Sequence, residues 1–285
     1  MSTQITTAFV NQFSANVQML SQQMGSLLRP AVDVESVTGE KAFFDQVGSV
    51  AAIAKTSRHS DTPILDTPHS RRQVSLTTYE WADLIDDSDK VRMLSDPTSS
   101  YARAAAAAIG RSMDDTVIAA LGGTAKTGKE GATSTTLPAA SKIAHGSAGL
   151  TVAKLVTAKK KLDEGSVDPS IPRYIVVSPE QVEDLLGSTS VTSADFNTVK
   201  ALVQGDIDTF VGFKFITSNR LTDDGTSRLC YAFAQDGLKL AIGKDVMAKI
   251  DERADKSYST QVFYCSTFGA TRMEEVKVVE IACNE

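Results

Sequence analysis

The residues with the clearest potential for chemistry lie between positions 123 and 130, where Gly123, Gly128 and Lys129 have the spacing of a phosphate-binding loop. In such a loop the glycines let backbone amides approach the phosphates, and the lysine is followed by a Ser or Thr that holds magnesium. Here the lysine is followed by Glu130, which would bring a negative charge toward the phosphates. The loop also needs a strand before it and a helix after it, whereas this copy follows a predicted helix. A nucleotide-binding enzyme that uses residues 123–130 is therefore kept only as an alternative function.

Four aspartates lie close together after Trp81, at Asp83, Asp86, Asp87 and Asp89. Carboxylates are good ligands for divalent cations, but this segment lacks the ligand spacing and the glycine turn of a calcium-binding loop. We therefore predict a short acidic helix, and we interpret the aspartates as a solvated face or as an acidic partner surface. In the second case they would meet an arginine-bearing segment of a neighbouring copy.

The three histidines, His59, His69 and His145, all fall in segments predicted to be loops. A hydrolase triad or a metal centre built on them would lack a rigid support. The sequence also contains neither a Gly-x-Ser-x-Gly elbow nor a dinucleotide-binding fingerprint. We therefore predict no catalytic residue, no cofactor and no metal site, and we expect that the chain is not an enzyme.

The composition of the 285 residues is that of a globular protein, with 42% hydrophobic and 22% charged residues, and it allows one large or two ordinary domains. The net charge of −6 means that the surface as a whole repels phosphate, which argues against a dedicated nucleic-acid binder. The 3 cysteines are widely spaced and indicate neither a disulfide framework nor a zinc site. We recognise no secretory signal and no membrane span, so we expect assembly in a cytosol.

One long helix is predicted, and both of its ends are marked in the sequence. Asp96 can cap the free amides, Pro97 suits the first helical position, and Gly122 with Gly123 ends the helix. The residues between these marks would span roughly 37 Å. Apolar residues recur among them every three or four positions, which indicates one broad buried face.

Residues 1–54 have apolar side chains at intervals near 3.6 residues as far as Pro30, which predicts an amphipathic helical arm that ends there. Residues 55–80 carry two prolines and little apolar alternation, so few of them can be buried on both sides. They suit a long hairpin that projects from the body and needs a partner surface, with a mobile surface loop as the alternative. The basic residues of this segment are candidates for contacts with a neighbour: Arg58, His59, His69, Arg71 and Arg72.

The rest of the chain mixes helices and strands without a strict repeat, which indicates an α+β fold. We predict a loop over residues 124–149. Helices are predicted over residues 151–164, from Pro179 with Ser178 as cap and Gln181 closing a capping box, and over residues 193–204. Strands are predicted over residues 173–178, 210–217, 229–234, 238–242, 246–251, 258–268 and 276–282.

The order of several segments resembles that of tailed-bacteriophage major capsid proteins. The segments that carry this resemblance are 22–30 (QQMGSLLRP) and 39–48 (GEKAFFDQVG) in the arm, 66–72 (DTPHSRR) in the extended loop, Asp96-Pro97 before the long helix, and 211–220 (VGFKFITSNR) in a late strand. The resemblance covers essentially the whole chain, and it lies in the order and spacing of these segments.

The resemblance implies the Hong Kong 97 type capsid fold. Its parts would be an N-terminal arm (1–54), an extended loop (55–80), a peripheral domain with a long spine helix (81–149 and 228–285) and an axial domain (150–227). The implied function is that of a major capsid protein, which self-assembles as hexamers and pentamers into an icosahedral head. An encapsulin-like compartment shell shares this fold and is the nearer alternative.

The resemblance also implies a set of partners. They are other copies of the chain, a portal protein and packaged double-stranded DNA, which is enclosed without sequence specificity. The arm is too short to contain the scaffolding segment of some relatives, so a separate scaffolding protein is expected. Assembly would take place in the host bacterial cytoplasm, with no membrane as a partner, and the product would be a virion capsid.

Overall fold

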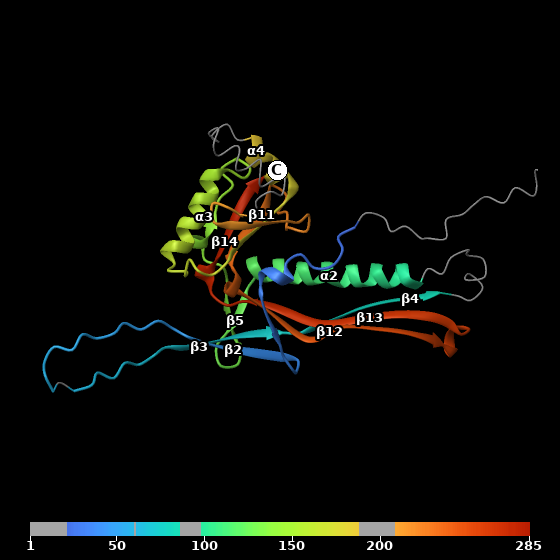
Figure 1. The fold of residues 1–285 in the computed structure, drawn as a ribbon, viewed down its shortest axis with the longest axis horizontal. Coiled ribbons are helices and arrows are strands. Elements are labelled where there is room, and N and C mark those ends of the chain that lie inside the picture. Colours follow the sequence, from blue (N-terminus) through green and yellow to red (C-terminus); the bar gives the residue numbers. More distant parts are fainter. Residues whose placement is uncertain (1–21, 60, 86–97, 188–208) are drawn as a thin grey trace, which may run out of the picture. The chain divides into compact units, whose positions relative to one another are not determined.

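The computed structural model describes residues 22–59, 61–85, 98–187 and 209–285, and the chain divides into two compact units (Figure 1). The first unit consists of Met1–Ser26, Thr78–Arg111 and Asp245–Ser266. The second unit is larger and consists of Leu27–Thr77, Ser112–Lys244 and Thr267–Glu285. Helices and sheets are mixed in the described residues, which confirms the predicted α+β class.

A six-stranded mixed sheet holds much of the buried core of the second unit. Its strands, in spatial order, are β7 (Lys142–Ile143), β14 (Val278–Asn284), β11 (Ser227–Ala234), β8 (Arg173–Val177), β10 (Phe213–Thr217) and β9 (Thr209–Phe210). β8 and β10 are parallel, whereas β11 runs antiparallel to both of its neighbours, β8 and β14. The buried run Ile175, Val176 and Val177 in β8 is typical of a strand that is covered on both faces. Figure 1 shows α3 (Val152–Glu164) and α4 (Pro179–Gly187) in this part of the second unit.

α4 begins at Pro179, as the sequence predicts, and α3 begins at Val152, one residue after the predicted start. The Thr151 side chain caps α3 by accepting a hydrogen bond from the backbone amide of Lys154, and the helix ends before Gly165. At the start of α4, the backbone amide of Ser178 donates to Oε1 of Gln181 at 2.9 Å. This is the backward half of the capping box that the sequence predicts.

A second sheet has four antiparallel strands. They are, in spatial order, β2 (Lys41–Val47), β3 (His69–Ser75), β5 (Ala125–Thr127) and β6 (Thr133–Thr135). β2 and β3 pair along their whole length, from Lys41 opposite Ser75 to Val47 opposite His69. Residues 48–68 join them, and the described residues of this connection contain no strand or helix. β2 and β3 are therefore the two sides of one long hairpin.

The third sheet has the order β1 (Asp33–Ser36), β12 (Leu238–Arg253), β13 (Ser259–Arg272) and β4 (Thr77–Ile85). In the second unit β1 runs parallel to the first part of β12. The amine of Lys239 lies 2.6 Å from the carboxylate of Glu35 and 3.2 Å from that of Asp33, which fixes this edge of the sheet. Short 3-10 helices complete the described chain: Arg29–Ala31, Ala139–Ser141, Gln235–Gly237, Ala254–Lys256 and Glu275–Lys277.

The long helix is α2 (Thr98–Gly122), with 25 residues, and it confirms the predicted helix and its end at Gly122 and Gly123. The glycines at its end are needed for packing. A Cβ atom at Gly122 would lie 2.3 Å from the hydroxyl oxygen of Tyr231, and one at Gly123 would lie 2.4 Å from the carbonyl oxygen of Ala119. No larger residue fits either position without a shift of its surroundings. The proposed cap residues, Asp96 and Pro97, lie outside the described residues.

Three secondary-structure predictions are wrong. Residues 81–85, expected to open an acidic helix, belong to β4, where alternation of Tyr79 and Trp81 favours a strand. Residues 124–149, expected to be a loop, contain β5, β6 and β7. Residues 22–28 of the arm are not helical, and Gly25 has a left-handed φ of 79° that interrupts a helix. The rest of the predicted arm helix, residues 1–21, and the helix over 193–204 lie outside the described residues.

The end of the arm lies close against α2 in the first unit. The Arg111 side chain donates from Nη1 to Oε1 of Gln22 at 2.9 Å and to the carbonyl oxygen of Gln23 at 3.1 Å. A Cβ atom at Gly110 would lie 2.5 Å from the carbonyl carbon of Gly25, so the two backbones approach closely. Gly110 is therefore required for this contact rather than for a turn.

The next residues of the arm are held by a buried carboxylate in the second unit. Asp114 is fully buried, and it accepts hydrogen bonds from the backbone amides of Leu27 at 3.0 Å and Leu28 at 3.1 Å. Charge-assisted bonds of this kind are about twice as strong as neutral ones. Leu28 is itself fully buried.

A buried arginine joins several elements of the second unit. Arg272 is fully buried, and its Nη1 donates to the carbonyl oxygens of Leu121 and Gly123, both at 2.8 Å. Its Nη2 donates to the carbonyl oxygen of Thr135 at 3.2 Å, and its Nε lies 3.7 Å from Glu275. Burial lowers the pKa of Arg272, while the carboxylate of Glu275 favours its charged form. A cation at the carboxyl end of α2 is also stabilised by the helix dipole.

Replacing Gly110 with Ala should lower the free energy of unfolding by about 1–3 kcal/mol, because the new methyl group overlaps the backbone of Gly25. Gly187→Ala is the matched control, since nothing lies within 4 Å of its Cβ position. Urea denaturation of the subunit measures both. Equal stability of the two variants would contradict the close approach.

Replacing Arg272 with Met should lower the free energy of unfolding by about 3–5 kcal/mol, the usual cost of removing one partner of a buried ion pair. Three backbone carbonyls would lose their donor at the same time. Arg253→Met removes an exposed arginine that pairs with Asp255, and it should change the stability little. A similar effect of both substitutions in the same denaturation experiment would show that Arg272 has no special role.

Candidate functional site

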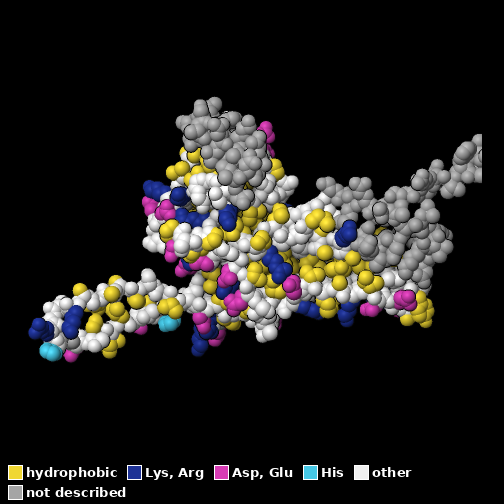
Figure 2. All heavy atoms as spheres, in the orientation of Figure 1, with side chains coloured by type: hydrophobic (Ala, Val, Ile, Leu, Met, Phe, Trp, Pro, Cys, Tyr) yellow, Lys and Arg dark blue, Asp and Glu magenta, His cyan; other side chains and the backbone are white. Residues whose placement is uncertain are grey.

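The most exposed feature of the described chain is the connection of the β2–β3 hairpin, residues 48–68, which we call the loop. Every described residue of the loop except Thr67 is exposed. Figure 2 shows it as a narrow extension with hydrophobic side chains along its length and basic side chains at its end. Arg58 and His59 lie at this end, and His59 has a left-handed φ of 57°. Arg58 and His59 remain candidates for contact with a neighbour.

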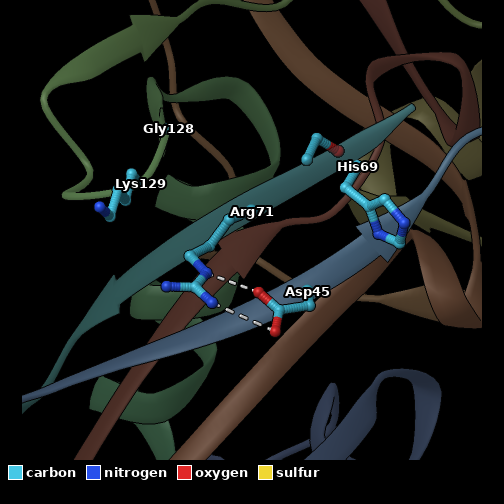
Figure 3. A pocket seen from close by; sticks show the side chains of 6 residues that line it. Asp45, His69, Arg71, Gly128 and Lys129 are labelled. Atoms are coloured by element: carbon cyan, nitrogen blue, oxygen red, sulfur yellow. Dashed lines mark hydrogen bonds and ion pairs between the residues drawn. The ribbon is translucent and has the colours of Figure 1, made fainter. Parts of the chain in front are cut away.

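At the base of the hairpin, β3 presents Arg71 to an open pocket of about 400 Å³. The pocket is lined by residues of β2, β3 and the turn between β5 and β6: Asp45, His69, Ser70, Arg71, Gly128 and Lys129 (Figure 3). The Arg71 side chain donates from Nε to Oδ1 of Asp45 at 2.5 Å and from Nη2 to Oδ2 at 3.3 Å. The hydrogen bonds to Arg71 lower the pKa of Asp45, and the same bonds raise the pKa of Arg71.

The charge of the pocket is positive once this pair is counted as neutral. Lys129 is exposed on the turn, and Figure 3 shows it on the same side of the sheet as Arg71. The guanidinium carbon of Arg71 lies 5.6 Å from the ring centre of Phe43, which holds the side chain over the strand. With Arg71 occupied by Asp45, Lys129 can bind a carboxylate from outside the subunit.

The structure of residues 123–130 does not suit phosphate binding. These residues form the strand β5 and the turn toward β6, rather than a loop that leads into a helix. The backbone amide of Gly128, which a phosphate would need, donates to the carbonyl oxygen of Arg71 at 3.2 Å. Among the described residues, no group of three or more His, Cys, Asp or Glu side chains is placed to hold a metal ion. The geometry of the turn thus favours strand pairing over nucleotide chemistry.

Arg72 points to the opposite face of β3 and is used inside the subunit. Its side chain is 8% exposed, and its Nη2 donates to both carboxylate oxygens of Glu275 at 2.7 and 2.8 Å. Its Nε donates to the carbonyl oxygen of Met273 at 2.8 Å. The guanidinium therefore has little surface left for another chain. This role could not be predicted from the sequence, because Glu275 is 203 residues away.

The remaining candidates are distributed as follows. His69 begins β3, is exposed, and borders the pocket beside Arg71. Asp83 is exposed on β4. Asp86, Asp87 and Asp89 lie outside the described residues. The structure thus brings His69 and Arg71 together and adds Asp45 and Lys129, which sequence reasoning did not assign to this surface.

Helices long and apolar enough to cross a membrane are absent from the part of the chain that the structure describes. A comparison with family models matches residues 5–285 to a family described as phage capsid protein. A comparison with curated proteins gives no significant match.

Comparison with solved structures shows the fold directly. The chain is similar to the capsid of the cyanophage P-SCSP1u, with 17% identity and a TM-score of 0.74, over 100% of this chain and 96% of that chain. It is similar to the capsid of Ralstonia phage GP4, with 11% identity and a TM-score of 0.74, over 97% and 95%. A chain of Mycobacterium phage Che8 matches with 18% identity and a TM-score of 0.68, over 96% and 97%.

The family match extends over nearly the whole chain, and the structural matches cover complete capsid chains. The fold is of the Hong Kong 97 type, as the resemblance of the sequence implied. Such a protein is structural, and it assembles with copies of itself into a shell that is part of the virion. The chain belongs to the phage capsid protein family and is the major capsid protein of a bacteriophage head.

Proposed function

We propose that the chain forms pentamers and hexamers that close into an icosahedral head around double-stranded DNA, and that each loop lies across a neighbouring copy. The loop carries this proposal, because it extends from a well-paired hairpin and exposes nearly all of its residues. The described residues of the loop contain no strand or helix, and they bury little surface within their own subunit. A neighbouring copy would supply a surface that covers them.

The proposed partners follow the same logic. A separate scaffolding protein would direct assembly in the host bacterial cytoplasm, a portal protein would occupy one vertex, and DNA would be enclosed without sequence specificity. The net charge of −6 disfavours tight binding of DNA to the shell, which suits a container. The subunit would act by assembly and not by catalysis.

The strand pairing suggests adjusted limits for the parts of the subunit. Because β2 pairs with β3 throughout, we place the start of the extended loop at Lys41 instead of residue 55. β11 and β14 share a sheet with β8, so we assign them to the axial domain. α2, β12 and β13 remain in the peripheral domain.

The pocket at the base of the hairpin is the proposed site of ionic contact with a neighbour. Arg71, Lys129 and His69 would face a carboxylate of the next copy. The acidic segment that starts at Asp83 is the candidate source of that carboxylate. Arg58 would add a second ionic contact at the end of the loop. Exposed pairs contribute about 0–1 kcal/mol each, but they are repeated around a closed ring.

Replacing residues 50–66 with a short Gly-Ser turn should leave the subunit folded and abolish shells. The β2–β3 pairs lie outside the deleted segment, so the hairpin would still form. Circular dichroism checks the fold, and sedimentation with negative-stain microscopy checks assembly, with the unaltered chain as control. Closed shells in normal yield from the shortened chain would refute the role of the loop.

Lys129→Glu should reduce the yield of shells at unchanged stability of the subunit, because Lys129 is exposed and the substitution reverses its charge in the pocket. Arg72→Glu is the contrasting variant. It would place two carboxylates together in a buried site, so the subunit itself should be destabilised. Denaturation curves and particle yields of both variants separate these effects. Normal assembly of Lys129→Glu would exclude the pocket from the contact.

A further inference from the structure

Two cysteines lie on neighbouring strands of the six-stranded sheet. Cys230 is in β11 and Cys283 is in β14, and these strands pair antiparallel (Figure 1). Cys230 lies opposite Ile281 and Cys283 lies opposite Arg228, so the two cysteines are diagonal neighbours. Side chains two positions apart on a strand share a face, which places both thiols on the same face of the sheet. Both side chains are fully buried.

The sulfur atoms of this pair are directed toward each other. Sγ of Cys283 lies 4.0 Å from the carbonyl oxygen of Ile281, the residue opposite Cys230. The two thiols form a hydrogen bond with each other. Diagonal neighbours have Cα atoms about 7–8 Å apart, and a disulfide needs about 4.4–6.8 Å. A movement of the end of β14 by about 1 Å toward β11 would therefore allow the two sulfurs to bond.

The end of β14 is already tied to β11. Arg228 donates from Nη2 to Oε2 of Glu285 at 2.6 Å and from Nε to the same oxygen at 2.9 Å. Cys283 is the second-last residue of β14. The movement that a disulfide requires is thus confined to the end of one strand.

The surroundings act differently on the two thiols. The hydrogen bond from Cys230 lowers the pKa of Cys283, and so does the positive charge of Lys154, while burial, Asp184 and Glu285 oppose this effect. The hydrogen bond and burial raise the pKa of Cys230. Because the thiolate is the nucleophile, Cys283 is the thiol that attacks an oxidant first.

Lys154 of α3 is held beside Cys283 by three hydrogen bonds. Its amine donates to the carbonyl oxygens of Ala148 at 2.6 Å, Gly149 at 2.8 Å and Ala282 at 3.0 Å. Ala282 directly precedes Cys283 in β14. A cation fixed in this way next to a thiol favours the thiolate.

We propose that Cys283 and Cys230 form a disulfide when the protein meets hydrogen peroxide. The thiolate of Cys283 attacks one oxygen of the peroxide, the O–O bond breaks, and a sulfenic acid and hydroxide are formed. The sulfur of Cys230 then attacks the sulfenic sulfur, the S–O bond breaks, and the hydroxide that leaves takes the proton of Cys230. In total, two thiols lose two electrons and two protons, and one peroxide becomes two waters.

Burial restricts this reaction to small oxidants. Neither thiol is exposed, so peroxide suits the site better than a bulky reagent such as glutathione disulfide. The bond would join β11 to the last strand of the chain. Since a cytosol keeps thiols reduced, the bond would form after the particle has left the host. This timing rests on the proposed assembly in the host cytoplasm, whereas the chemistry does not, because both cysteines belong to one subunit.

Thiol counting on the purified full chain tests the pair. The chain has 3 cysteines, so peroxide should leave one thiol that N-ethylmaleimide labels after denaturation. A peptide map should show Cys230 joined to Cys283, and dithiothreitol should restore all the thiols. Three labelled thiols after the treatment, or a bond that includes Cys265, would overturn the proposal. None of these results bears on whether the chain forms shells.

Single substitutions separate the roles of the cysteines. Cys265→Ser is the matched control, because Cys265 is also buried but lies in β13 of another sheet, and this variant should still form the bond. Cys230→Ala removes the second thiol, so Cys283 should stop at the sulfenic acid, which dimedone labels. In Cys283→Ala, labelling of Cys230 should be about tenfold slower. Faster labelling of Cys230 than of Cys283 would contradict the assigned order of attack.

The bond should also raise the temperature at which the chain unfolds. A disulfide of ordinary strength corresponds to an increase of about 5–10 °C. Calorimetry of the peroxide-treated chain, with and without dithiothreitol, measures this difference. An unchanged temperature would show that the bond does not hold β14 on the sheet and would refute that part of the proposal.

Discussion

The second unit depends on one carboxylate that serves two arginines. Glu275 binds Arg72 with both oxygens and lies 3.7 Å from Nε of Arg272. Arg272 in turn donates to carbonyls at the end of α2 and in β6. One buried network therefore connects the base of the hairpin, the end of the long helix and the strand β13. Removal of any member leaves a charge without its partner in a buried site, which is among the most costly changes in a protein.

This network explains how an exposed loop can be presented in a defined direction. On its inner face, β3 is held by the ion pair between Arg72 and Glu275. On its outer face, Arg71 pairs with Asp45 beside the pocket. Successive residues of a strand point to opposite faces, so two adjacent arginines have opposite roles. The inner arginine holds the hairpin on the subunit, and the outer one lies at the surface that we propose as a contact with a neighbour.

Much of the helical structure could be predicted because its signals are local. α2 is ended by Gly122 and Gly123, α3 is capped by Thr151, and α4 is opened by Ser178 and Gln181. Each of these signals lies within a few residues of the helix end that it determines. Local sequence therefore sufficed for these three helices.

The strands of the hairpin and the partner of Arg72 were not predictable in the same way. β2 is defined by pairing with β3, which lies beyond a loop of twenty-one residues (48–68). Glu275 is 203 residues from Arg72 and is brought near only by the complete fold. If residues 69–75 had been predicted as a strand, the alternation of side chains between its two faces would have placed Arg71 and Arg72 on opposite sides. The sequence predicts a hairpin within residues 55–80, but its first strand, β2, lies before this segment. Basic and polar residues outnumber apolar ones there, so the composition does not mark where the strands begin and end.

We propose that residues 48–68, whose described members are nearly all exposed in the single subunit, are covered by a neighbouring copy in the assembled shell. Cryo-electron microscopy of particles formed by the full chain tests this claim most directly. The account requires closed shells of five- and six-fold rings in which residues 48–68 lie on a neighbouring subunit. Shells in which this segment folds back on its own subunit, or a stable monomer under all conditions of assembly, would contradict it.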